Sequence, residues 1–457
     1  HVRNRSGHVR SASAARIFPI MADVRPFRAT RYATDLVGPL ETVASPPYDV
    51  IDEAARQALA SRSPFQFVHL DLPVAAPGEP ADARYARAAS TWDAWRRAGI
   101  VKRDAEPAFY VYWQTFTLPN GSSVTRKGFL GLTRLHAYAD KVILPHERTL
   151  KGPKADRLAL MRATEAQLSQ IFLLYDDPSG TVDATLTGAL PVHPIGDFKT
   201  GDGIRHQIWS VDDPAAVATV SSALADRQLL IADGHHRYET ALAYAEEVGG
   251  DADHPSQFAL AFFANASDPG LVVLPTHRGL HDVPGFDADA FVDGLADIFK
   301  LDVLDPRLRA QSWCDTLEEA GAAGPAFVFL VPDAGEVRPV LARLDPERAA
   351  AQLAALDVAP SLKTLDVTLL HNLLLEHRLG ISREAQAAKT NLAYFKEATE
   401  LAEQVAGSAL QLGVLMNGTP VRRVREVCES GEFMPQKSTF FYPKVLSGVV
   451  IYDLNPA

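Results

Sequence analysis

A carboxylate, two imidazoles and a guanidinium stand within five residues in the segment Asp233-Gly234-His235-His236-Arg237. The apolar run Leu229–Ile231 before it is typical of the end of a buried strand. Gly234 breaks that strand, and Tyr238–Val248 favours a helix that Gly249-Gly250 ends. The first turn of a helix offers free N–H groups and a partial positive charge. The segment therefore predicts a phosphate site; the alternative is a surface turn with scattered polar residues.

A second polar cluster follows the apolar pair Ile143-Leu144 and the turn residue Pro145. It holds His146, Glu147 and Arg148, and a helix expected over residues 154–167 adds the cations Lys154 and Arg157. A carboxylate among cations keeps its charge, which suits a general base or a ligand for a hydroxyl group or a metal. The same pattern also suits a Glu147 that caps the helix.

A third cluster lies near the end of the chain, where Lys437, Ser438 and Thr439 stand between Met434-Pro435 and the aromatic run Phe440–Tyr442. An ammonium and two hydroxyls in a partly apolar turn predict a clamp for a carboxylate or a phosphate. The alternative is a hairpin corner whose lysine lies along the surface.

Two further turns are candidate walls of the same cleft. Asp49 follows two prolines that stiffen the backbone, and it either lines a cleft or caps the helix that begins near Asp52. His277 and Arg278 follow an apolar strand expected over residues 271–274. They either add to an anion site or form a surface turn.

The elements that must position these clusters follow from periodicity. Alternation over Phe65–Leu72 predicts a strand, and residues 181–203 are expected to be an irregular loop and strand region. Val367–Leu379 predicts an amphipathic helix. Its His371 and His377 are six residues apart and do not share a helix face, so they are not expected to share a metal.

Length and composition limit the kinds of protein that this chain can be. The chain has 457 residues, which favours two or three domains, and its net charge of −11 argues against a nucleic-acid-binding surface over the whole protein. Two widely spaced cysteines indicate a reducing compartment, so we expect a cytoplasmic protein. No apolar run is long enough for a transmembrane helix. The basic, acid-free residues 1–20 resemble an upstream extension, and disorder is expected over residues 1–23.

The clusters resemble known motifs. Asp233–Leu242 is similar to the phosphate-binding strand–turn–helix of the ParB/sulfiredoxin superfamily, and its Asp-Gly-His-His-Arg resembles the SerK-type free serine kinases. Pro145-His146-Glu147 matches a Pro-His-Glu upstream in those kinases. Gly431-Glu432 with Lys437-Ser438-Thr439 is similar to their final segment, although Gln436 and Ser438 depart from its Pro and Thr. Over about Arg25–Leu454, the chain resembles a bacterial family of conserved domains of unknown function.

The resemblance implies a fold and a division of the chain. The expected class is mixed α+β, with a ParB/sulfiredoxin-like nucleotide-binding core and added N-terminal and inserted α/β subdomains. The expected parts are an N-terminal segment over 24–140, the catalytic core over 141–280 and a C-terminal region over 281–457 that completes the substrate site. The kinases are much shorter, so an added domain can change the substrate.

The resemblance also implies an activity, which is phosphorylation of free L-serine, or the reverse transfer from phosphoserine, with Mg²⁺ and with ATP, ADP or pyrophosphate. Glu147 would accept the hydroxyl proton, and Asp233 would hold Mg²⁺ or act as a second carboxylate. The implied phosphate and nucleotide contacts are His235, His236, Gly234, Arg237, His146, Arg148, Lys154 and Arg157. The implied substrate contacts are Lys437, Ser438, Thr439, Asp49, His277 and Arg278.

Two other functions remain open from the sequence. A ParB-like nucleotide-binding protein associated with DNA would need a basic reading helix, and none stands out. A metal-dependent hydrolase would use His235, His236 and Glu239, although adjacent histidines seldom bind one metal from a helix start. The oligomeric state does not follow from these patterns.

Overall fold

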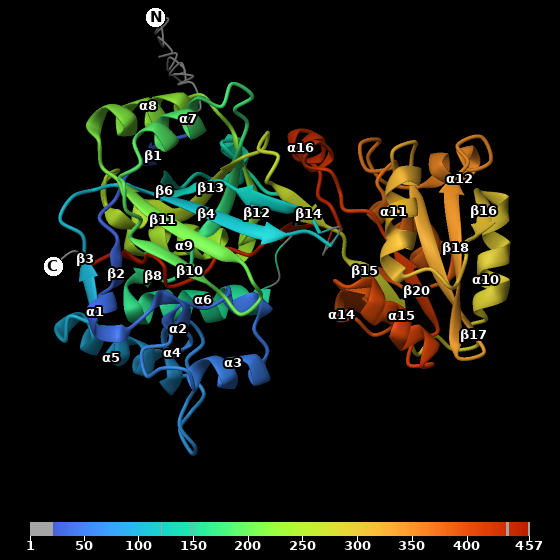
Figure 1. Ribbon diagram of the computed structural model, residues 1–457, viewed down its shortest axis with the longest axis horizontal. Coiled ribbons are helices and arrows are strands. Elements are labelled where there is room, and N and C mark those ends of the chain that lie inside the picture. Colours follow the sequence, from blue (N-terminus) through green and yellow to red (C-terminus); the bar gives the residue numbers. More distant parts are fainter. Residues whose placement is uncertain (1–21, 120, 148, 150, 436–437, 456–457) are drawn as a thin grey trace, which may run out of the picture.

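The computed structural model describes residues 22–119, 121–147, 149, 151–435 and 438–455. The described chain forms two lobes, each built on its own β-sheet (Figure 1). The mixed α/β class expected from the sequence is confirmed. Arg148 and Lys437 lie outside the described residues, as does most of the segment 1–23 for which disorder was predicted.

The first lobe is organised around a ten-stranded sheet. Successive side chains of a strand point to opposite faces of the sheet. In the strand Ile171–Tyr175, Ile171 and Leu173 therefore enter one hydrophobic cluster, while Phe172 and Leu174 enter another. The sheet is mixed: β13 pairs with β9 in parallel and with β6 antiparallel. Its strands in spatial order are β10 (Gly196–Lys199), β11 (Arg205–Val211), β4 (Phe109–Thr117), β6 (Phe129–Arg134), β13 (Phe258–Asn265), β9 (Ile171–Tyr175), β12 (Leu229–Asp233) and β7 (Ile143–Leu144), with β1 (Val24–Arg25) beside β6 and β5 (Ser123–Arg126) beside β4.

Helices cover this sheet on both sides (Figure 1). Val220 and Leu224 of α8 (Pro214–Ala225) pack with Leu173 and Phe263, and α7 (Thr181–Gly188) lies beside α8. Tyr238 and Ala241 of α9 (His235–Val248) enter the same cluster as α8, α6 (Lys151–Thr164) packs against α9, and α5 (Ala83–Arg97) packs against α6. The remaining helices of this lobe are α1 (Thr34–Val37), α2 (Leu40–Val43), α3 (Glu53–Ala60) and α4 (Val68–Asp71).

The second lobe has a six-stranded sheet in the order β16 (Phe299–Val303), β18 (Glu336–Leu344), β17 (Ala326–Asp333), β20 (Leu412–Leu415), β15 (His277–Leu280) and β19 (Leu392–Phe395). Its helices are α10 (Ala288–Gly294), α11 (Ala310–Gly321), α12 (Ala350–Ala355), α14 (Arg383–Ala388) and α15 (Ala398–Ala406). The helix predicted over Val367–Leu379 is present. It starts as α13 (Asp366–Thr368) and continues as a π-helix over Leu369–Arg378.

The chain crosses between the lobes twice, and the two crossings pair with each other. β14 (Val272–Leu274) leaves the first lobe and runs antiparallel to β21 (Phe440–Tyr442), which returns to it. Beyond β21, Gln114 Nε2 donates to the Lys444 carbonyl at 2.9 Å, and β22 (Tyr452–Asp453) pairs with β8 (Ala166–Gln167). The return strand therefore carries the third polar cluster back to the first lobe.

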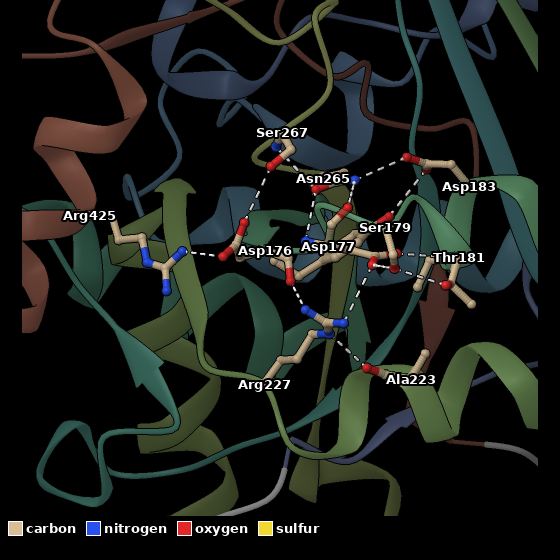
Figure 2. A network of polar contacts seen from close by, with 12 residues as sticks. Asp176, Asp177, Ser179, Thr181, Asp183, Ala223, Arg227, Asn265, Ser267 and Arg425 are labelled. Atoms are coloured by element: carbon tan, nitrogen blue, oxygen red, sulfur yellow. Dashed lines mark hydrogen bonds and ion pairs between the residues drawn. The ribbon is translucent and has the colours of Figure 1, made fainter.

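Helix α16 (Val421–Glu429) lies between the lobes in Figure 1 and is tied to the first lobe by an ion pair. Figure 2 shows this contact, in which Arg425 reaches Asp176 at the end of β9. In the same network Asp177 accepts the N–H of Val182, in the first turn of α7, at 2.9 Å. The network explains why Thr181 starts a helix, α7, where the sequence predicted an irregular region.

Two other elements differ from their predictions. The helix expected over residues 154–167 ends at Thr164, and Ala166–Gln167 form β8. Residues 68–71 of the segment predicted as a strand form α4 instead. Gln66 is fully buried, and its side chain donates to the Ala44 carbonyl at 2.8 Å and accepts the N–H of Val68 at 2.7 Å. A tertiary side-chain contact therefore overrides the alternating pattern. The main sheet takes strands from both sides of the predicted boundary at residue 140, and the proposed division into parts stays a prediction.

Among the described residues, no helix combines the length and apolar character that crossing a membrane requires.

Candidate active site

The turn between β12 and α9 is built as the sequence predicts. Gly234 has φ = 90° and stands at the start of α9, and Gly249, with φ = 68°, follows its last residue. The positive φ favours glycine here, and a Cβ at Gly234 would lie 2.9 Å from Nε of Arg237, so it would also displace the Arg237 side chain. The turn places Asp233 at the end of a strand and His235, His236 and Arg237 in the first turn of a helix.

His146 connects the three polar clusters. Its Nδ1 lies 2.7 Å from the carbonyl oxygen of Ile231, which can only accept, so Nδ1 carries the proton. Its Nε2 therefore accepts the hydroxyl of Thr439, at 2.8 Å. Burial lowers the pKa of His146 to about 4, which keeps the imidazole neutral near pH 7. His146 thus orients Thr439 by means of a fixed tautomer.

His235 packs against His146, with the ring centroids 4.7 Å apart in an edge-to-face arrangement. Its Nε2 accepts the backbone N–H of His146 at 3.2 Å. Burial holds the pKa of His235 well below its usual range, so the neutral ring carries its proton on Nδ1. Only that Nδ1–H remains to donate to a phosphate. His236 is half-buried, and burial lowers its pKa as well.

Asp233 lies between two cations. Lys444 Nζ is 2.5 Å from Oδ1, and Nη2 of Arg237 is 2.6 Å from Oδ2. Burial alone would raise the pKa of Asp233, but the charges of Lys444 and Arg237 outweigh it and hold the pKa well below its usual range. The side chains of Asp233 and Lys444 are only 16% and 15% exposed. The carboxylate therefore stays ionised and fixes both cations at the end of β12.

Glu147 lies beside this group with its side chain 20% exposed. Its Oε1 is 3.3 Å from the backbone N–H of Ser438 and 3.8 Å from Nε2 of His146. The segments around it are also joined, because the backbone N–H of Met434 donates to the His146 carbonyl at 2.8 Å. A partly exposed carboxylate that touches the third cluster is well placed to accept a proton from a bound hydroxyl group.

The cations predicted for nucleotide binding already have acidic partners. Lys154 Nζ and the hydroxyl of Thr149 both donate to Oε2 of Glu239, at 2.6 and 2.7 Å. Arg157 is buried and binds Asp71 and Asp156, at 3.1 and 2.6 Å. Among the described residues no group of three or more His, Cys, Asp or Glu could hold a metal ion. The contacts of Glu239 with Lys154 and of His235 with His146 disfavour the hydrolase alternative.

The candidate substrate residues fall into two groups. Ser438 and Thr439 lie next to Glu147 and His146, and exposed Asp49 interacts electrostatically with His236 and Arg237. Asp52, and not Asp49, caps α3, by accepting the N–H of Ala55 at 2.8 Å.

His277 and Arg278 are buried in the second sheet. His277 Nδ1 accepts the N–H of Met416 at 3.1 Å, and Nη2 of Arg278 is 3.3 Å from Nε2 of His371. Arg278 also interacts electrostatically with Glu147. These bonds hold both side chains in their own lobe.

Sequence reasoning missed Lys444, which completes the charge pair with Asp233, and Tyr48 and Asp71, which surround Arg157. Lys444 follows three aromatic residues and Pro443, and its immediate neighbours carry no charge or motif that would suggest a site. The spacing of 211 residues between Lys444 and Asp233 leaves no local signal. The sequence therefore did not predict that a cation distant in the chain pairs with the carboxylate of Asp233.

Buried histidines, His235 among them, predict how stability depends on pH. Burial lowers the pKa of His146, His206 and His277 to about 4 and that of His371 to about 3, against 6.5 without burial. The unfolded chain therefore binds more protons below pH 6.5, and stability falls as the pH is lowered towards 4. Below pH 6.5 we expect a loss approaching about 1.4 kcal/mol per pH unit from each histidine and above it little change, measured by denaturant unfolding between pH 7.5 and 5.

The matched controls for this experiment are His146→Gln, which should make the pH dependence shallower, and exposed His193→Gln, which should leave its slope unchanged. Stability that is constant from pH 7.5 to 5 would contradict the neutral, buried state of these rings.

Comparison with known proteins places the chain in a family. The family model described as "Protein of unknown function (DUF1015)" matches residues 24–368, which is more than half of the chain. The chain belongs to the DUF1015 family. The expected membership of a family of conserved domains of unknown function is thereby confirmed. No protein with a curated description matches the sequence.

Solved structures similar to this DUF1015 protein are distant. A free serine kinase in complex with AMP has 14% identity and a TM-score of 0.32, covering 66% of this chain and 86% of its own. A conserved hypothetical protein from Pyrococcus furiosus has 14% identity and a TM-score of 0.31, with 66% and 90% covered. SbnI from Staphylococcus aureus, truncated at its C-terminus, has 10% identity and a TM-score of 0.34, with 70% and 86% covered. The ParB/sulfiredoxin-like core stays a prediction.

Proposed function

We propose that this DUF1015 protein is a phosphotransferase that moves a phosphoryl group between a nucleotide or pyrophosphate and the hydroxyl of free L-serine or a similar hydroxy amino acid. One observation carries the proposal. Three segments that are far apart in the chain meet, namely His146-Glu147, Asp233–Arg237 and Ser438-Thr439. His146 bonds both to Ile231, at the end of the strand before Asp233, and to Thr439. Glu147 accepts the backbone N–H of Ser438. If any one of these segments were only a surface turn, it would not have to contact the other two.

In the forward direction the hydroxyl oxygen of serine attacks the terminal phosphorus, and the bond from that phosphorus to the leaving nucleotide oxygen breaks. The hydroxyl proton passes to the carboxylate of Glu147. Phosphoryl transfer needs positioning and neutralisation of charge more than covalent chemistry. Lys444 and Arg237, held by Asp233, supply fixed positive charge, and the N-terminus of α9 supplies free N–H groups.

Ser438 and Thr439 are assigned to the amino acid, with Asp49, Arg278 and the predicted Lys437 as further candidates around it. Mg²⁺ is usually held by one or two carboxylates together with substrate phosphates. The metal would supply additional neutralisation of the phosphates. Both oxygens of Asp233 already accept from cations, so the ion is assigned to the nucleotide complex and not to the protein alone.

The test is incubation of the protein with L-serine plus Mg²⁺ and ATP, ADP or pyrophosphate, and with phosphoserine plus ADP or phosphate, followed by phosphorus NMR. We expect a phosphoserine signal, or its loss, with at least one combination. Absence of turnover in every combination contradicts the proposal.

A further inference from the structure

Arg126, the last residue of β5, is a fully buried cation. Its Nη2 donates to Oε1 of Gln114, but its Nε and Nη1 are buried and have no hydrogen-bond partner among the described residues. The guanidinium carbon lies 4.8 Å from the centre of the Phe172 ring and 5.3 Å from that of Phe262. These rings compensate the charge only in part, because a buried cation needs a counter-charge and a partner for each N–H.

The lack of a bonded carboxylate sets Arg126 apart from the other buried arginines of the first lobe. Arg157 and Arg237 each bind a carboxylate directly. Asp233 and Asp268 act on Arg126 electrostatically, but neither bonds to it. Burial lowers the pKa of Arg126 to about 9, so the guanidinium still carries its charge near pH 7. The first lobe therefore holds a buried positive charge that its own side chains do not neutralise.

This charge lies behind the pair formed by Asp233 and Lys444. Phe172, on which Arg126 stacks, is paired with Asp233 across β9 and β12. The amide of Gln114 that accepts from Arg126 also donates, through Nε2, to the Lys444 carbonyl at 2.9 Å. The ammonium of Lys444 in turn binds Asp233. Arg126 is therefore connected to the end of β12 through two neighbours, one ring and one amide.

An anion bound at the end of β12 would supply the counter-charge that Arg126 lacks. Asp233 does not supply it, because both of its oxygens accept from Lys444 and Arg237. Since Arg126 is fully buried, its charge acts on such an anion at a distance and not by contact. Charges interact more strongly through the interior of a protein than through water, so the burial that makes Arg126 costly also makes its field effective.

We propose that Arg126 is a positioning residue of the phosphate site, an inference that rests on the proposed phosphotransferase function. Its buried charge favours an anionic ligand at the end of β12, and its bond to Gln114 holds the amide that fixes the main chain at Lys444. The ligand class is a polyphosphate, either the phosphate groups of the nucleotide or pyrophosphate. The uncompensated charge lowers the stability of the protein without ligand, and binding of the anion offsets that cost.

Arg126→Met tests this role, because the apolar side chain fills much of the same space without the charge. Removing an uncompensated buried charge also removes its desolvation cost, so we expect the midpoint of denaturant unfolding to stay the same or rise. The affinities for ADP and for pyrophosphate, measured by calorimetry, should fall about tenfold. A lower midpoint with unchanged affinities would assign Arg126 to stability alone. The matched control is Arg307→Met, at an exposed arginine of the second lobe, which should change neither quantity.

Gln114→Glu is a second variant, which guards against an Arg126→Met protein that fails to fold. A carboxylate at position 114 would pair with Arg126 and cancel its charge, and it cannot donate to the Lys444 carbonyl. ADP and pyrophosphate should again bind about tenfold more weakly. Affinities within about twofold of the unmodified protein, in either folded variant, overturn the role of Arg126 and leave the proposed function standing. An unmodified protein that binds neither ADP nor pyrophosphate overturns the proposed function, and the role of Arg126 falls with it.

Discussion

Replacing Glu147 by Gln is expected to reduce phosphoryl transfer by about 10²–10⁴-fold, the usual contribution of a general base. Gln keeps the size of the side chain and an oxygen that can accept the Ser438 N–H, but it cannot take a proton from a hydroxyl group. The bond of His146 to Thr439 does not involve this carboxylate, so the site around His146 should keep its geometry. Turnover is measured by phosphorus NMR, and ADP affinity by calorimetry.

The expected pattern is therefore a lower kcat with ADP affinity within about twofold of the unmodified protein. Glu246→Gln is the matched control, because Glu246 is an exposed residue of α9 and the same chemical change there should leave kcat unaltered. Full turnover by Glu147→Gln would remove Glu147 from the reaction. Loss of turnover together with loss of ADP binding would assign Glu147 to ligand binding instead.

The local parts of this site are predictable from sequence because each depends on few residues. The run Leu229–Ile231, the glycine at 234 and Gly249-Gly250 define a strand, a left-handed turn and the end of a helix without reference to the rest of the fold. The turn after Ile143-Leu144 follows in the same way, since that pair forms β7 at the edge of the main sheet.

What the sequence cannot provide is the pairing of distant groups. Lys444 meets Asp233 only because β21 returns beside β14 and carries the chain back to the first lobe. Arg157, predicted as a nucleotide contact, is held by Asp71 and stacks on Tyr48, two contacts that were not predicted. Such contacts depend on topology, and topology does not follow from local periodicity.

Asp233→Asn is expected to destabilise the protein strongly as well as to inactivate it. The substitution keeps the shape of the side chain but removes the charge that lies between Lys444 and Arg237, whose side chains are 15% and 8% exposed. Breaking a buried ion pair by removal of one partner costs about 3–5 kcal/mol, because the remaining charge is left without compensation. Two cations would remain here, so we expect the free energy of unfolding of the first lobe to fall by about that amount.

A double-mutant cycle with Lys444→Met separates this electrostatic effect from a general loss of packing. Met fills much of the space of the lysine without its charge, so Asp233→Asn combined with Lys444→Met should be less destabilised than the sum of the two single changes. The measurement is the denaturant concentration at the midpoint of the first unfolding transition, with the slope compared among the four proteins. Additive effects would show that Asp233 and Lys444 do not stabilise each other. In that case the fixed positive charge that phosphoryl transfer needs at the end of β12 would have to come from Arg237 alone.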